Sequence, residues 1–204
     1  MQEIFSTPES FTVEGDVLVK FSSDANCVTV PEGIRVIGKE AFFRKSHIKS
    51  ITLPSTLEVI EDYAFYGCAG LSEIALPQSL KCLGEFAFSA CRALTEITLP
   101  QGLTQMGEGC FFWCDMLRTA SLPSSLRHLP AHTFEKCPHL QTVTLSEGLV
   151  SIGWGAFSDC TRLHHLDLPQ SVEQINGALA SPQMRLSATH PCPRPEWKTV
   201  KRRK

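Results

Sequence analysis

Nine cysteines give this chain of 204 residues its most reactive side chains, and five of them recur at one fixed interval. A structural zinc site needs two or more Cys or His ligands within one turn, together with a second pair nearby. The recurring cysteines instead stand one per repeat, where a small apolar side chain would point inward, and free cysteine packs as a small hydrophobe. We therefore expect a role in the core, and neither a metal nor a cofactor. The five are Cys68, Cys91, Cys114, Cys137 and Cys160.

Histidine, serine and threonine side chains offer a second chemistry, nucleophilic and acid–base catalysis. A hydrolase needs a nucleophile, a base and an orienting group in one pocket. The seven histidines lie mostly at variable, outward-facing positions, and the sequence holds no G-x-S-x-G, no H-E-x-x-H and no glycine-rich phosphate loop. We therefore expect a protein that is not an enzyme.

The sequence contains an internal repeat with a period of twenty-three residues, and this repeat sets where the cysteine, serine, threonine and histidine side chains lie. Proline recurs at one position of the repeat, with Ser146 filling the single gap, and phenylalanine recurs at another. This period over about 150 residues predicts a solenoid, in which stacked coils bury the apolar edge that one coil cannot bury alone. The repeated prolines are Pro31, Pro54, Pro77, Pro100, Pro123 and Pro169, and the repeated phenylalanines are Phe42, Phe65, Phe88, Phe111, Phe134 and Phe157.

One copy of the repeat shows how each coil is expected to fold. Within residues 94–100, polar and apolar side chains alternate from Glu96 onward, which predicts a short strand with Ile97 and Leu99 facing inward. The proline that follows ends the strand, because it has no N–H to continue a ladder. Phe111 and Cys114 stand at helical spacing, so we expect one tight helical turn on the outer side of the coil.

The repeat also resembles a known family. Residues 71–91 follow the pattern L-x-x-I-x-L-P-x-x-L-x-x-I-G-x-x-A-F-x-x-C nearly throughout, and residues 94–114 repeat it. This pattern resembles the BspA-type (treponemal) leucine-rich repeats of bacterial surface antigens, over about three quarters of the chain. The resemblance implies an α/β fold: a leucine-rich-repeat solenoid with a parallel β-sheet on one face and short helical turns on the other. Residues 11–21 look like the β-hairpin that caps the first coil of such arrays.

The expected division of the chain is a capping hairpin at residues 1–26, the solenoid at 27–180 and a disordered basic tail at 181–204. Residues 1–180 carry 12 Lys and Arg against 20 Asp and Glu, whereas residues 181–204 carry 7 against one. The acidic body is a poor match for nucleic acid, except at the tail. No apolar stretch reaches the ~18 residues that a membrane span needs. Cys192, in the tail, is the thiol that we expect to be exposed and reactive.

Two surfaces are candidates for binding a protein partner. The first is the outward sheet face, which is flat, hydroxyl-rich and mildly acidic; the second is an edge of aromatic residues beside the repeated phenylalanines. Each also has a plainer interpretation, as a solvated face in the first case and as a cover over the turns in the second. The sheet-face residues are Glu73, Glu96, Thr98, Thr119, Thr142, His165 and Asp167, and the aromatic-edge residues are Phe43, Tyr66, Phe112, Trp113 and Trp154.

The function that these features predict is non-catalytic protein binding. The resemblance implies adhesion to host, matrix or cell-surface proteins. The alternative is an intracellular scaffold or adaptor that uses the same repeat surface, because Met1–Phe5 shows no secretory signal and an odd number of cysteines favours reduced thiols. The location, the identity of the partner and self-association through the C-terminal coil stay open.

Overall fold

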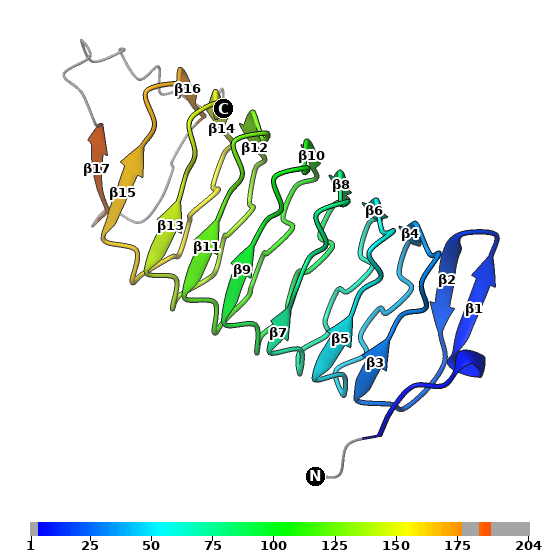
Figure 1. The fold of residues 1–204 in the computed structure, drawn as a ribbon. Helices are drawn as coiled ribbons and strands as arrows, with labels where there is room; N and C mark the ends of the chain where they lie inside the picture. Colours follow the sequence, from blue (N-terminus) through cyan, green and yellow to red (C-terminus); the bar gives the residue numbers. More distant parts are fainter. Residues whose placement is uncertain (1–3, 177–183, 189–204) are drawn as a thin grey trace, which may run out of the picture.

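The chain winds into a solenoid of parallel strands that form two rows along its length (Figure 1). The structure, a computed structural model, describes residues 4–176 and 184–188. The first row consists of β3 (Cys27–Thr29), β5 (Ser50–Thr52), β7 (Glu73–Ile74), β9 (Glu96–Thr98), β11 (Thr119–Ser121), β13 (Thr142–Thr144), β15 (His165–Leu168) and β17 (Arg185–Ala188). The second row consists of β2 (Val17–Phe21), β4 (Val36–Ile37), β6 (Val59–Ile60), β8 (Cys82–Leu83), β10 (Gln105–Met106), β12 (His128–Leu129), β14 (Ser151–Ile152) and β16 (Gln174–Ile175).

Within the repeats, neighbouring strands pair one repeat apart, so equivalent residues lie in line along the solenoid axis. Ile97 of β9 pairs with Ala120 of β11, which pairs in turn with Val143 of β13. The solenoid and its parallel strands are confirmed. The second row adds a finding to the predicted single sheet, since five to six residues after each proline position the chain forms a further strand of two residues, such as β6 after Pro54.

The turn side, which we define as the chain between each second-row strand and the next first-row strand, contains no helix in the described residues. The predicted helical turns are therefore wrong. In each coil, two residues that bracket the repeated phenylalanine adopt a left-handed backbone; around Phe65 they are Tyr63, with φ of 56°, and Gly67, with φ of 72°. A right-handed helix needs a negative φ at every residue, so these positions exclude it.

Hydrogen bonds between coils explain why the turn side does not become helical. The N–H of Phe65 donates to the carbonyl of Ala87 at 2.8 Å, in the following coil of the chain, and the left-handed Tyr63 donates to Glu85 at 2.9 Å. Around the repeated phenylalanines, these bonds run from an N–H of one coil to a carbonyl of the next. They satisfy backbone donors that a helix would use within the coil.

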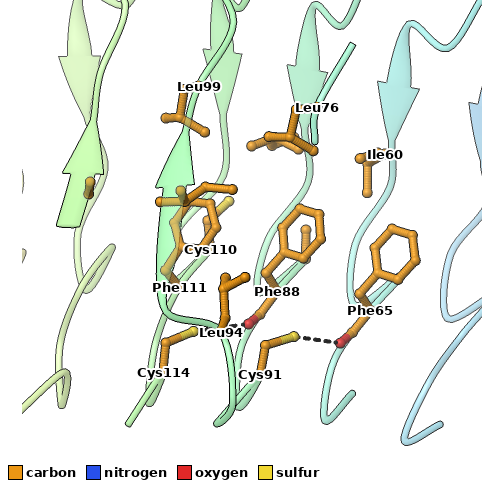
Figure 2. Close-up of a cluster of buried hydrophobic side chains, with 14 of the residues drawn as sticks. Ile60, Phe65, Leu76, Phe88, Cys91, Leu94, Leu99, Cys110, Phe111 and Cys114 are labelled. Atoms are coloured by element: carbon orange, nitrogen blue, oxygen red, sulfur yellow. Dashed lines mark hydrogen bonds between the residues drawn. The ribbon is translucent and has the colours of Figure 1, made fainter. Parts of the chain in front are cut away.

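The repeated phenylalanines stack into a single spine inside the solenoid, with ring centroids between 4.9 and 5.7 Å apart. Figure 2 shows three of these rings, Phe65, Phe88 and Phe111, side by side in the core. Phe21 of β2 extends the spine and stacks on Phe42 at 5.1 Å. Phe21 was not predicted as part of the spine, because its distance from Phe42 along the chain is shorter than the period of the repeat.

The N-terminal residues cover the first end of both rows. β1 (Phe11–Glu14) forms an antiparallel hairpin with β2, and β2 pairs with β4, so the hairpin extends the second row. The 3-10 turn η1 (Pro8–Ser10) precedes the hairpin. Phe5 forms a parallel bridge with Cys27 of β3, which covers the edge of the first row.

At the other end, β17 adds a last strand to the first row. It pairs in parallel with β15 and places Leu186 opposite Leu166. The step from Asp167 to its partner Ser187 is shorter than one repeat, so the strand has no counterpart in the repeat. β17 lies within the segment that was predicted to be a disordered tail; residues 181–183 and 189–204, with Cys192, lie outside the described residues.

Candidate binding surfaces

The outward face of the first row carries all seven residues predicted for it, and every one is exposed. Strand alternation places them there: on β9, Glu96 and Thr98 face solvent while Ile97 is buried. A shallow hollow lies over β5 and β7, where Ala75 occupies the position that Thr98 holds one coil later. Glu73 and Glu96 border this hollow, which makes the face locally acidic.

At the C-terminal end of this face, a His, an Asp and a Ser meet, which are the residue types of a hydrolase. His165 Nε2 lies 2.9 Å from Asp167 Oδ1 and 3.0 Å from Ser187 Oγ, and Ser187 also donates to Asp167. A catalytic triad needs the carboxylate on one ring nitrogen and the hydroxyl on the other. Here both partners meet Nε2, so the cluster ties β17 to β15 without activating the serine. Hydrogen bonds from Ser187 and His165 lower the pKa of Asp167.

The aromatic edge forms a continuous row of rings along the turn side. Phe43 stacks on Tyr66 at 5.2 Å, and Tyr66 contacts Tyr63 at 5.9 Å. Tyr63 then stacks on Phe86 at 5.5 Å, and Phe86 meets Phe112 edge-on at 6.3 Å. Tyr63 and Phe86, which the sequence also places beside the repeated phenylalanines, connect the other rings into a row.

Burial divides the predicted edge residues into two kinds. Phe43, Tyr66 and Phe112 are half-buried, so they cover the turns as well as facing solvent. Trp113 and Trp154 keep 41% and 45% of their surface exposed. Trp154 meets the ring of His132 edge-on at 4.8 Å and lies farther along the solenoid than the row itself. Among the predicted edge residues, the two tryptophans are therefore the rings most available to a partner.

Cationic side chains that were not predicted from the sequence accompany the edge. The guanidinium of Arg92 lies 4.3 Å from the ring centroid of Trp113, and the Lys136 ammonium lies 5.9 Å from the same ring. Arg44 lies 5.2 Å from the ring of Phe43. The contacts of Trp113 join residues of successive coils, so only the stacking of the coils reveals them, whereas Arg44 and Phe43 meet within one left-handed turn.

A shallow trough runs along the turn side, parallel to the solenoid axis, beside the aromatic edge between Arg44 and Trp113. Gly67, Ala69 and Ala90 contribute its small lining residues, from two successive coils. Larger lining side chains come from both directions along the axis: Arg44 from the preceding coil and Trp113 from the following one, with Arg92 and Tyr66 beside them.

The repeated cysteines lie buried in the core, each in contact with the backbone of the preceding coil. Each of the five lies 3.0 to 3.3 Å from the carbonyl oxygen of a repeated phenylalanine and donates its S–H to it. Burial raises the pKa of Cys68 to about 12, so the thiol stays protonated and unreactive at neutral pH. No group of three or more His, Cys, Asp or Glu side chains able to hold a metal occurs among the described residues.

Within the same described ranges, no helix has the length and apolar character that crossing a bilayer requires.

Comparison with known proteins bears on the fold. The model of the BspA type leucine rich repeat region matches six copies, within residues 20–140 and 58–181. The chain is similar to a leucine-rich repeat protein of T. pallidum, with a TM-score of 0.68 and 24% identity over 79% of this chain and 91% of that one. No curated protein matches the chain.

Two longer proteins share the fold over part of their length. A leucine-rich repeat protein from Bacteroides ovatus has a TM-score of 0.59 and 23% identity, covering 84% of this chain and 55% of its own. The pneumococcal vaccine antigen PcpA has a TM-score of 0.59 and 18% identity, covering 88% of this chain and 46% of its own. The present chain thus spans about half the length of each. Identities this low establish a common fold alone.

Proposed function

Because the chain belongs to the family of BspA-type leucine-rich repeat proteins, we propose that it is a non-catalytic protein-binding module whose aromatic edge is the binding surface. The observation that carries this proposal is the exposure of Trp113 next to Phe112 at the end of a continuous row of half-buried rings, with Trp154 exposed farther along the solenoid. Tryptophan and tyrosine dominate the energetics of protein interfaces, because they bury a large area at a small cost in conformational entropy. Exposed aromatic clusters on a soluble scaffold mark contact sites.

The outward face of the first row is the second candidate surface. Its support is the hollow at Ala75, where the small side chain leaves an open space bordered by Glu73 and Glu96. The face has no exposed ring among the seven predicted residues apart from the imidazole of His165, so it offers fewer anchors than the edge.

Site-specific photo-crosslinking in the source cells tests the two surfaces. A benzophenone amino acid is placed at position 113 on the edge, at position 142 on the first-row face, and at position 105 on the exposed side of the second row as a control. We expect partner crosslinks from position 113 that the Phe112→Ala substitution weakens. Crosslinks from position 142 alone would assign binding to the sheet face and contradict the proposed edge.

The biological role that we propose for this module is adhesion to host, matrix or cell-surface proteins. Its support is the membership in a family known from surface antigens and the shared fold with a protein described as a vaccine antigen. The alternative role, an intracellular scaffold or adaptor, is favoured by the eight described cysteines, all of which are free thiols.

Protease treatment of intact source cells separates these two roles. An antibody against the repeats follows the protein before and after the treatment. Loss of the protein from unbroken cells is the result expected for adhesion, whereas survival of the protein until lysis would leave the scaffold.

A further inference from the structure

The trough on the turn side differs in shape and charge from the rest of the solenoid surface. Its small residues, Gly67, Ala69 and Ala90, leave the backbone of two coils accessible between bulkier neighbours. The two ends, Arg44 and Trp113, stand three repeats apart. Three steps of ~4.8 Å give a length of about 14 Å. An extended peptide covers this distance with about four residues, at roughly 3.3 to 3.6 Å per residue.

The charged residues that line the trough differ in sign from the excess charge of residues 1–180. Residues 1–180 carry an excess of acidic side chains, yet the charged residues that line the trough are Arg44 and Arg92. Among the described residues, no carboxylate lies within ion-pair distance of Arg44 or of Lys136, and Arg92 has one half-buried partner, Asp115, at 3.7 Å.

The acidic residues of the same coils lie at a different repeat position. Asp62, Glu85 and Glu108 precede the repeated phenylalanines by three residues, whereas Arg44 and Lys136 follow them by two. In the coils of Phe65, Phe88 and Phe111, the turn side therefore presents carboxylates at a repeat position other than that of Arg44; in the outer coils the two positions hold Lys39 and Asp159.

We propose that the trough binds an extended, acidic segment of a protein partner. The small lining residues let the peptide backbone approach closely, and the guanidinium groups of Arg44 and Arg92 donate paired hydrogen bonds to its carboxylates. The exposed ring of Trp113 packs against an apolar or aromatic side chain of the same segment. This inference rests on the proposed function and names the chemistry of the partner at one part of the aromatic edge.

A labelled peptide tests the charge requirement directly. The probe is fluorescein-labelled Glu-Glu-Phe-Glu-Glu, compared with Gln-Gln-Phe-Gln-Gln, and fluorescence anisotropy measures binding to the full chain at low salt. We expect the glutamate peptide to bind at least about tenfold more tightly than the glutamine peptide, with an affinity that falls as salt is added. Equal affinities for the two peptides would overturn the proposal.

Charge-reversal variants locate the site. Arg44→Glu combined with Arg92→Glu should weaken binding of the glutamate peptide at least about tenfold. The matched control, Arg118→Glu with Arg127→Glu, makes the same change in net charge at exposed positions outside the trough, and it should stay within about twofold of the parent chain. If both variants lose the same affinity for the glutamate peptide, the loss comes from the change in net charge alone, and the proposed site is overturned. Thermal unfolding of each variant verifies that it is folded.

Two further arms separate the remaining outcomes. Heparin serves as a sulfated polysaccharide probe; if it binds the trough and displaces the glutamate peptide at far lower concentration, the occupant is an anionic polysaccharide and the proposal is overturned. If the glutamate peptide fails to bind while photo-crosslinks from position 113 persist, the acidic-segment inference fails and the aromatic edge remains a binding surface. Failure of both overturns this inference together with the proposed edge.

Discussion

The thiol of Cys91 donates a hydrogen bond to the carbonyl oxygen of Phe65, with 3.3 Å between the sulfur and the oxygen (Figure 2). The same oxygen accepts the backbone N–H of Cys68 at 3.2 Å. The carbonyls of Phe42, Phe65 and Phe88 thus each receive one bond from their own coil and one from the next. The repeated cysteine therefore does more than fill space, because its S–H satisfies a buried acceptor that alanine could not reach.

Replacing Cys91 with alanine should lower the free energy of unfolding by about 1–3 kcal/mol, since the change removes a buried donor and leaves a small void. Urea unfolding measures the loss. Cys82, which is only partly buried in the second row, provides the control, and Cys82→Ala should cost about 0.5 kcal/mol or less. Equal costs for the two substitutions would remove the special role of the repeated position.

The buried thiols should make the fold sensitive to alkali. Burial raises the pKa of Cys68 and Cys110 from 9.0 to about 12, and it raises that of Cys91 well above 9.0. Between these values the unfolded chain loses thiol protons that the folded chain retains, so the free energy of unfolding falls as the pH rises above 9. Each thiol contributes roughly 1.4 kcal/mol per pH unit in this window, and its contribution is fully present at neutral pH.

Urea titrations at a series of pH values between about 8 and 10.5 measure this fall. The variant Cys68→Ala, Cys91→Ala should show a shallower decline than the parent chain, because two of the titrating groups are gone. A decline that is equally steep in the variant would show that groups other than these thiols cause the alkaline sensitivity.

The spine and the aromatic edge should respond differently to truncation. Phe88 is fully buried and stacks between Phe65 and Phe111, with centroid distances of 5.0 and 5.6 Å. Phe88→Ala should therefore cost about 3–5 kcal/mol of stability. Phe86, two residues earlier, is half-buried in the outer row, so Phe86→Ala should cost about 1–2 kcal/mol. Chemical unfolding of both variants checks the order, and a larger loss at Phe86 would contradict it.

Close contact between coils should make Gly107 hard to replace. A Cβ atom at this position would lie 2.5 Å from the backbone nitrogen of Glu85 in the preceding coil. Gly107→Ala should destabilise the chain by about 1–3 kcal/mol, because backbone must move to make room. The exposed neighbour Gln105 is the control, and Gln105→Ala should change stability by about 0.5 kcal/mol or less. A neutral Gly107→Ala would show that the coils can separate at this point.

The sequence was sufficient to predict the core, because a constant period aligns equivalent side chains whatever the path between them. It was not sufficient to predict the turn side. The spacing of Phe111 and Cys114 fits a helical turn as well as it fits a stack of tight turns. The hydrogen bonds that select the tight turns join residues of different coils, so no local pattern shows them. β17 was missed for a related reason, since its shorter step breaks the period.

Of the candidate site, the sequence was sufficient to predict the exposed tryptophans but not the residues that surround them. Trp113 and Trp154 stand out in the sequence as rings at variable positions, and the structure shows that both are exposed. The position of Arg92 over Trp113 depends on two coils being stacked, so no local pattern could reveal it. The same holds for the trough, which exists because Gly67 and Ala90 occupy one repeat position in adjacent coils.

The backbone hydrogen bonds made by the repeated phenylalanines run in one direction and give the rod a polarity. From Phe42 to Phe134, the N–H of the repeated phenylalanine donates to a carbonyl of the following coil, and Phe21 of the hairpin already donates to Ala41 of the first coil at 2.9 Å. The thiol bonds run the other way, from each repeated cysteine to a carbonyl of the preceding coil. The two faces of a coil therefore differ, and a second copy turned end for end would bring the phenylalanine N–H groups to face one another, so an extension of this ladder must proceed head to tail.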